Sequence, residues 1–405
     1  MKRKLINFAY KHISTELIKI PIFFIIVFAI FFVNVVRGYF GTADMISAEI
    51  FVTVILVVLC QGIASILSNA ICRKLEDGKK LATDYEELVK MYPLTEMMEY
   101  KNIKFPAIIL SQRTKSSKPF NILINDKIAR YCLPTQIKGI SDYLFKAHKF
   151  SMVYNNICIR LDDFIEDDYK ITLVTSRTTF FDSLITNRAM DYFWRNGKTI
   201  RKVYEPKPYL NSLIESKLSN HLGFNGFIET SDNKFAFILR NRKHSIGKNT
   251  LGNSVSATLK SEYALNENFE FTRTYLKIAI YKEIENELGV LVSDIEFPDC
   301  IISFYRDIVE GGKPQFLFYI KIDVSSDVLR TTFQEKVKER KLDDKNTTDG
   351  KTIYFFTLED MVKSDILPGK LVLHNDLAKK VGKKHFSITP SAAASMIMLI
   401  NFFDM

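Results

Sequence analysis

Two long runs without a charged residue stand near the N-terminus of this chain. The first covers residues 20–36 and the second covers residues 50–72. An α-helix needs about 20 apolar residues to cross the hydrocarbon core of a bilayer, so the second run is long enough and the first is at the short end. Lys19 and Arg37 flank the first run and can lengthen it by snorkelling. The pattern predicts a two-helix transmembrane region in residues 1–72, with spans at about 20–36 and 50–71.

The charges around these runs indicate their orientation. Five Lys and Arg residues precede the first run, four follow the second within residues 73–80, and the connecting segment 37–49 holds Arg37 against Asp44 and Glu49. The positive-inside rule therefore places both termini in the cytoplasm. A cleaved signal peptide is the alternative for the first run, but no small-x-small cleavage site follows it promptly.

One face of the second run is polar. Gln61, Ser65 and Ser68 recur at helical spacing, and Asn69 lies beside them. These side chains can form hydrogen bonds between helices, either within the hairpin or within an oligomer. Alternatively, the polar face lines water when several chains assemble.

The pattern changes after the second run. Residues 73–100 have helical periodicity and mixed charge, which predicts a juxtamembrane helix or linker. Residues 101–222 contain short β-rich runs at 105–110, 120–126, 157–161 and 170–176, with helical stretches expected at 181–196 and 208–222. They indicate an α+β extension, which is either part of the following domain or a separate module.

From residue 223 the elements follow a clear order. The segment 223–243 predicts a strand, a turn at 231–233 and a second strand. A helix is expected over 272–290, ending at Gly289, which suits the position after a helix. Strands at 301–309 and 314–323 are joined by Gly311-Gly312, a hairpin turn signal. Residues 223–405 are thus expected to form a cytoplasmic α+β domain with a mixed sheet between helices, and 337–351 a charged surface loop.

The amino-acid composition limits the classes of binding partner that are expected. The chain has 56 Lys and Arg against 46 Asp and Glu, a net charge of +10. This balance fits an anionic partner, or the juxtamembrane basic residues of a membrane protein. The basic residues form no long stripe, so DNA and RNA are not expected partners. The 5 cysteines are scattered and odd in number, which argues against a disulfide framework.

The helix at 272–290 carries a partial motif. Its tail, KEIENELGV (282–290), resembles the second half of the Nudix box, R-E-U-x-E-E-x-G-U, where U is apolar. Glu283, Ile284, Glu287, Gly289 and Val290 match. Four positions depart from the pattern. Lys282 replaces Arg, Asn286 replaces the first Glu of the pair, and Thr274 replaces a further Glu in the front half. A Gly expected there is Asn268.

The resemblance implies metal-dependent cleavage of a diphosphate. Carboxylates on the helix would hold Mg²⁺, a cation that prefers oxygen ligands, and the metal would activate water. Glu283 and Glu287 are four residues apart and share a helix face, so they are the candidate metal ligands. Asn286 and Thr274 remove two acids, so we expect no cofactor and no catalytic residue, with Mg²⁺ required only if hydrolysis is retained. A solvated or salt-bridged helix face is the alternative for Glu283 and Glu287.

Basic residues around the predicted strands are the candidate ligand contacts, because Arg and Lys side chains suit phosphate. They are Arg240, Arg242, Lys282, Arg306 and Lys313. Ordinary surface charge is the alternative for each of them taken singly.

Two transmembrane helices joined to a degenerate Nudix-like domain resemble the two-transmembrane Nudix effectors of bacterial CBASS anti-phage systems, a class of CD-NTase-associated proteins. The resemblance implies a multi-pass protein of the bacterial inner membrane that binds a cyclic oligonucleotide second messenger. It then forms a homo-oligomer and disrupts the lipid bilayer, so that infected cells stop growing or die. The alternatives are a membrane-anchored Nudix hydrolase of nucleoside-diphosphate-linked compounds and a structural tether that uses the Nudix fold to bind a protein.

Overall fold

The computed structural model describes residues 24, 28, 38, 61–64, 80–145, 148, 155–168, 170–193, 197–240, 247–291, 299–342 and 350–404. The chain divides into two compact units, residues 1–80 and 81–405. Among the described residues, no helix is long and apolar enough to span a membrane. The two predicted spans lie almost wholly outside these residues, and so do Ser65, Ser68, Asn69 and Arg242. Gln61 is described, in a helical and exposed position.

The second unit is a mixed α+β fold. Its described helices are α4 (Tyr85–Lys90), α5 (Thr135–Lys138), α6 (Ser141–Phe145), α7 (Phe180–Leu184), α8 (Ile200–Tyr204), α9 (Ser261–Ala264), α10 (Arg273–Leu288), α11 (Ser326–Leu342), α12 (Leu358–Lys363), α13 (Asn375–Val381) and α14 (Pro390–Phe402). Its described strands are β1 (Glu99–Tyr100), β2 (Ile103–Lys104), β3 (Ala107–Gln112), β4 (Asn121–Arg130), β5 (Ile157–Asp167), β6 (Lys170–Thr179), β7 (Gly223–Glu229), β8 (Phe235–Arg240), β9 (Leu251–Gly252), β10 (Val255–Thr258), β11 (Ile301–Asp307), β12 (Lys313–Lys321), β13 (Gly350–Phe356), β14 (Asp365–Leu367), β15 (Lys370–Val372) and β16 (His385–Ser387).

An eight-stranded sheet is the centre of this unit. Its order is β13-β8-β7-β12-β11-β3, with β10 beside β7 and β9 beside β8. Strands β7 and β12 pair in parallel, whereas their other neighbours pair antiparallel. Because β3 pairs with β11, the segment 101–222 contributes a strand to the same sheet as the residues after 223.

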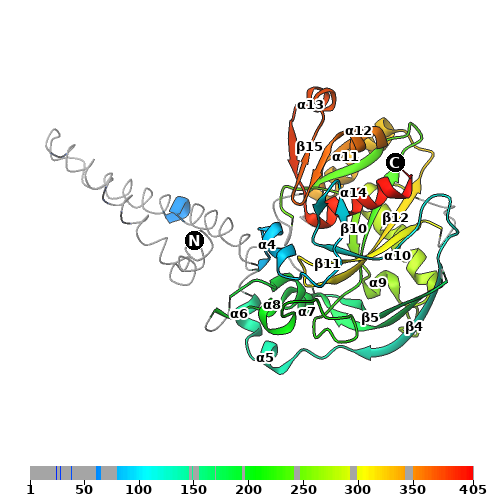
Figure 1. Ribbon diagram of the computed structural model, residues 1–405. Coiled ribbons are helices and arrows are strands. Elements are labelled where there is room, and N and C mark those ends of the chain that lie inside the picture. Colours follow the sequence, from blue (N-terminus) through cyan, green and yellow to red (C-terminus); the bar gives the residue numbers. More distant parts are fainter. Residues whose placement is uncertain are drawn as a thin grey trace. The chain divides into compact units, whose positions relative to one another are not determined.

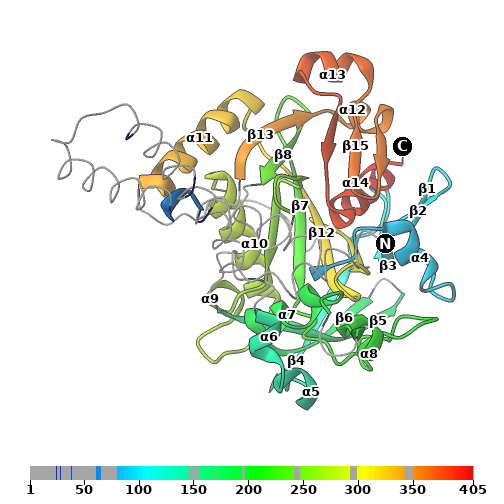
Figure 2. The same ribbon diagram turned by 90° about the vertical axis from the view of Figure 1, so that its left-hand side faces the viewer.

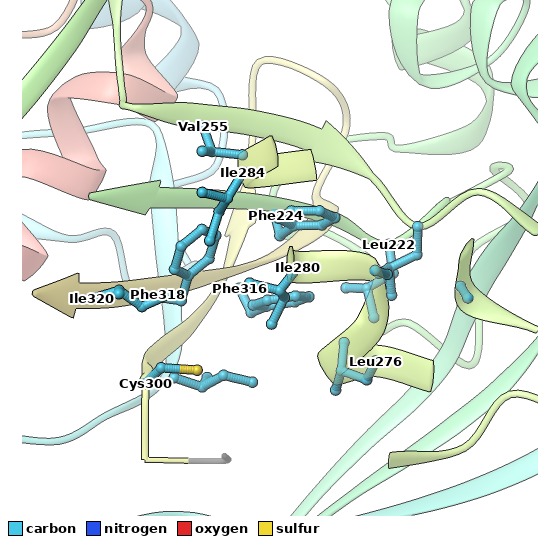
Figure 3. Packing of buried hydrophobic residues seen from close by; sticks show 14 of the residues in the cluster. Leu222, Phe224, Val255, Leu276, Ile280, Ile284, Cys300, Phe316, Phe318 and Ile320 are labelled. Carbon is cyan, nitrogen blue, oxygen red and sulfur yellow. The ribbon is translucent and has the colours of Figure 1, made fainter. Parts of the chain in front are cut away.

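Both faces of the sheet are apolar. Successive side chains of a strand point to opposite faces, so Phe224, Phe316 and Phe318 pack on one side and Phe227 and Leu317 on the other. Figure 2 shows α10 and α11 on the first side of the sheet and α14 with α12 and α13 on the second. Residues of α10 close over the rings of the first side (Figure 3).

Two three-stranded sheets flank the central sheet (Figure 1). A mixed three-stranded sheet, β4-β6-β5, contributes Ile122, Leu161 and Leu173 to the core under α10. An antiparallel sheet, β14-β15-β16, contributes Leu371 and Phe386 to the core around α14.

The helix that carries the motif forms as predicted. Thr272 caps its start by accepting from the Tyr275 N–H, and Gly289 ends it in the left-handed region at φ +78°. The buried positions from Leu276 to Leu288 follow the helical period. The strands at 223–229 and 235–240, and the turn between them, also match the prediction.

Three predictions were wrong, one of them completely and two in part. Residues 208–222 form no helix, because the carboxylate of Glu205 accepts from the Asn211 N–H and the Ser216 hydroxyl and holds an irregular loop in place of helical turns. The expected helix at 181–196 is reduced to α7 and a 3-10 turn at Asn187–Ala189 in its described part. The expected loop at 337–351 begins as helix, because α11 continues to Leu342.

A substitution at Gly226 can test the close packing of the central sheet. A Cβ at this position of β7 would overlap the ring of Phe318. Gly226→Ala is therefore expected to lower the free energy of unfolding by roughly 1–3 kcal/mol through overpacking. Gly139→Ala is the matched control, since the nearest atom to its Cβ is at 3.5 Å. Equal melting temperatures for the two variants would contradict the packing described here.

Candidate functional site

The face of α10 that carries the motif is closed by an ion pair. Glu283 is 4% exposed, and its Oε1 accepts from the Nζ of Lys260 at 2.7 Å. Lys260 directly precedes α9, which packs on α10. On the same helix the Asn286 amide donates to the Tyr263 hydroxyl at 3.4 Å, and partial burial raises the pKa of Tyr263. We call Lys260, Tyr263, Glu283 and Asn286 the helix site.

The helix site does not fit a divalent metal held by several carboxylates. A lysine ammonium neutralises Glu283, and an amide stands at Asn286 where the family pattern has an acid. Thr274 is exposed and carries no acid, and Glu287 is half-buried. Within the described residues, no group of three His, Cys, Asp or Glu side chains is arranged to hold a metal ion.

A second set of charged groups surrounds the β11–β12 turn. The carboxylate of Glu310 lies 3.4 Å from the Nζ of Lys313 and 3.6 Å from the Nε of Arg188. These cations lower the pKa of Glu310, whereas burial raises the pKa of Asp307. Gly311 and Gly312 have φ values of +68° and +77°. We call Arg188, Asp307, Glu310 and Lys313 the turn cluster.

Residues 187–220 cover this turn. Arg201 is 1% exposed, forms two 2.9 Å hydrogen bonds with Asp191, and donates to the carbonyls of Ile308 and Val309. Asn187 donates to the Glu310 carbonyl at 2.8 Å. The extension therefore seals the turn from solvent.

The structure distributes the predicted ligand contacts unevenly. Arg306 and Lys313 are 5% and 4% exposed, and Arg306 donates to the carbonyls of Gly312 and Asn211. Lys282 is on the exposed side of α10 and pairs with Glu285 at 3.0 Å. Arg306 thus forms internal hydrogen bonds and Lys313 an internal ion pair at the β11–β12 turn, while Lys282 faces solvent.

Arg240 differs from Lys282, Arg306 and Lys313, the other candidate contacts that the structure describes. It lies at the end of β8, and no hydrogen bond or ion pair of its guanidinium occurs in the described part of the chain. A Cβ at Gly247 would lie 3.1 Å from its Nη1, and one at Gly252 would lie 3.3 Å from its Nε. Arg240 also lowers the pKa of Glu310, so it lies within electrostatic range of the turn cluster. It is a half-buried guanidinium with its donors available.

Sequence reasoning missed Lys260, Arg188, Asp307 and Glu310. Lys260 and Glu283 are 23 residues apart, and Arg188 and Glu310 are farther apart still. No local spacing identifies such pairs, because only the tertiary fold brings them together. These residues are distinguished by the burial of their charged side chains. The amino-acid composition does not reveal which charges are buried.

No known family model matches this chain, and no curated protein matches it. A solved structure of DR0079 from Deinococcus radiodurans matches part of it. The identity is 13%, the match covers 44% of this chain and 81% of that chain, and the TM-score is 0.24.

Glu205 makes stability depend on pH. Burial raises its pKa to about 7, above the usual value near 4.5. Such a carboxyl favours the folded state below pH 4.5, and this contribution is lost as the pH rises through 7. Glu205→Gln cannot ionise, so it is expected to remove up to roughly 3 kcal/mol of the decline in unfolding free energy between pH 4.5 and 8. Denaturant unfolding at both pH values measures this, with exposed Glu335→Gln as the control. A parent-like slope in Glu205→Gln would assign the pH dependence elsewhere.

Proposed function

We propose that this protein is a membrane effector whose Nudix-like region, from residue 223 onward, binds a cyclic oligonucleotide without hydrolysing it. The observation that carries the non-hydrolytic part is the 2.7 Å pair between Lys260 and Glu283. In the family pattern, Glu283 would face a metal ion. In this protein, its negative charge already has a partner from the chain itself.

The energetics favour keeping this pair. Glu283 is buried, and removing one partner of a buried pair leaves an uncompensated charge at a cost of about 3–5 kcal/mol. A divalent cation would have to displace Lys260 and would find an amide at Asn286 in place of a carboxylate. Binding without cleavage therefore suits this site better than diphosphate hydrolysis.

The ligand class follows from the resemblance described above and from the available cation. A cyclic oligonucleotide presents phosphodiesters, which an Arg fork can bind through two hydrogen bonds. Within the described residues, the Arg240 guanidinium has no hydrogen-bond partner, and it lies where a Cβ at Gly247 or Gly252 would approach it closely. It is the best supported of the five candidate contacts.

The output proposed for the N-terminal hairpin is disruption of the inner membrane after homo-oligomerisation. Two helices from one chain cannot enclose a pore, so several chains must associate. Ligand-linked cytoplasmic domains would raise the local concentration of hairpins. The polar positions Gln61, Ser65, Ser68 and Asn69 would then face one another or water.

A designed reversal tests the non-hydrolytic site. Lys260→Ala with Asn286→Glu removes the internal cation and restores the family acid beside Glu283 and Glu287. This double variant is expected to gain Mn²⁺ binding, measured by electron paramagnetic resonance, because three carboxylates then share one helix face. The single variant Lys260→Gln is the control for loss of charge alone. If the parent already binds Mn²⁺ and cleaves dinucleoside diphosphates, the hydrolase alternative replaces this proposal.

Charge reversal at Arg240 tests ligand binding. Arg240→Glu is expected to weaken binding of the cyclic di- or trinucleotide that the parent prefers by about tenfold or more, because a charge-assisted hydrogen bond contributes about 1.5–3 kcal/mol. Arg330→Glu is a matched control on exposed α11. Isothermal calorimetry with a panel of such nucleotides measures both. Arg306 is unsuitable for this test, since a Glu buried at that position would unfold the turn. Unchanged affinity in Arg240→Glu would remove this residue from the site.

A further inference from the structure

The sheet β4-β6-β5 has an open edge in the described part of the chain. Its edge strand β4 pairs in parallel with β6, and no other described strand pairs with β4. The opposite edge differs, because Cys158 and Arg160 of β5 form bridges with Lys260 and His221. An open edge presents a row of backbone donors and acceptors, and such a row is a template for a further strand.

The first half of β4 carries none of the devices that usually protect an open edge. Residues 121–125 read Asn-Ile-Leu-Ile-Asn, which is the same sequence in both directions, and they contain no charge and no proline. We call them the edge segment. The second half of β4 is protected, because it holds Lys127 and because a register shift interrupts its pairing with β6 between Asp126 and Arg130. The edge segment is therefore the part of β4 that suits a partner strand.

Leu123, at the centre of the edge segment, belongs to an exposed row of side chains that crosses the sheet. It is opposite Thr172 of β6, and Thr172 is opposite Ile165 of β5. Residues that are directly opposite each other share a face of the sheet, and Leu123 and Ile165 are 42% and 49% exposed. Ile122 and Ile124 point to the other face and pack in the core under α10. The exposed row thus reaches the open edge at Leu123.

We propose that the edge segment pairs antiparallel with the edge segment of a second copy of this chain, about a two-fold axis at Leu123. The palindrome favours this partner, because Asn121 then lies opposite Asn125 of the second copy. Ile122 likewise lies opposite Ile124, and Leu123 lies opposite its counterpart. Apolar side chains therefore meet apolar side chains, the amides can form hydrogen bonds with each other, and no like charges meet. The exposed row continues from one copy into the other.

The contact is small and joins two chains. Five residues from each copy are fewer than the roughly 20–30 of a standard interface, so we expect the association to depend strongly on protein concentration. A two-fold contact uses the same edge of both copies, so neither β4 remains available to a third chain. The inference deepens the proposed function, on which it rests for its role, by naming a surface for homo-oligomerisation. The pairing itself requires neither the ligand nor the N-terminal runs.

Cysteine cross-linking of the full chain in detergent micelles tests this pairing. Cys158 and Cys300 are buried and are kept, and the other cysteines are changed to Ala. Leu123→Cys places two thiols opposite each other with Cβ atoms about 5 Å apart, which is within reach of a disulfide. Mild oxidation and non-reducing electrophoresis are expected to show at least fivefold more dimer for Leu123→Cys than for Ile165→Cys. Ile165→Cys is the matched control on the same face, because five strand spacings of about 4.8 Å separate it from its counterpart in the dimer.

Charge at the axis tests the pairing without a cross-link. Leu123→Lys brings two ammonium groups together, so the dissociation constant of the dimer is expected to rise at least tenfold. Ile165→Lys adds the same charge to the same face away from the axis and is expected to leave that constant unchanged. Sedimentation velocity of the full chain in detergent measures both. Both positions are exposed, so the melting temperatures are expected to stay near that of the parent.

The failures of the two proposals are distinguishable. Equal cross-linking of Leu123→Cys and Ile165→Cys overturns the edge pairing in favour of a contact between faces or of random collision. A Leu123→Cys chain that melts like the parent and forms no dimer also overturns it, as does an unchanged dissociation constant in Leu123→Lys. These outcomes leave the proposed ligand binding untouched. That binding fails instead if the same preparation takes up no cyclic di- or trinucleotide in calorimetry.

Discussion

Arg201 sets the constraint on which the second unit depends. Its guanidinium is almost fully buried, and the cost of burying a charge is large unless every donor finds a partner. Asp191 and the carbonyls of Ile308 and Val309 supply those partners. Because the carbonyls belong to the β11–β12 turn, whereas Arg201 and Asp191 both belong to the preceding extension, separating the two segments would take two acceptors away from the buried guanidinium. This part of the extension is consequently held against the β11–β12 turn by buried hydrogen bonds and is not an appended module.

The same constraint decides which cations remain for a ligand. Arg306 and Lys313 are enclosed by the extension and already have internal acceptors at Gly312, Asn211 and Glu310. Lys260 neutralises Glu283 on α10 in a similar manner. Arg240 lies outside these networks, at a strand end between two glycines. Internal acceptors thus pair with Arg306, Lys313 and Lys260. Among these four described cations, Arg240 is the one whose donors remain for an incoming phosphate.

How far the sequence predicts this structure depends on the range of the interactions. The caps of α10, at Thr272 and Gly289, and the glycine turn between β11 and β12 are local signals, and their elements were predicted closely. The loop at 208–222 was mistaken for a helix because Glu205, six residues before Asn211, takes over its backbone donor. The pairing of β3 with β11 and of Lys260 with Glu283 joins distant segments, and no spacing rule reports them. Two of the proposed ligand contacts, Arg306 and Lys313, belong to such long-range networks, and composition gave no indication of their burial.

These networks also bear on how a bound ligand could act. A ligand shifts a conformational equilibrium only by its differential affinity for two states, and the turn cluster is held in one arrangement by paired charges and by the Arg201 hydrogen bonds. Arg306 ties the loop that contains Asn211 to the same turn, and the Tyr92 hydroxyl donates to the Glu205 carbonyl at the start of that loop. A rearrangement within the second unit would therefore break several buried hydrogen bonds at once. Association between chains requires no such loss, because it acts on surfaces that the fold already exposes. This difference in cost is the physical reason to prefer oligomerisation over an internal switch as the trigger in the proposed function.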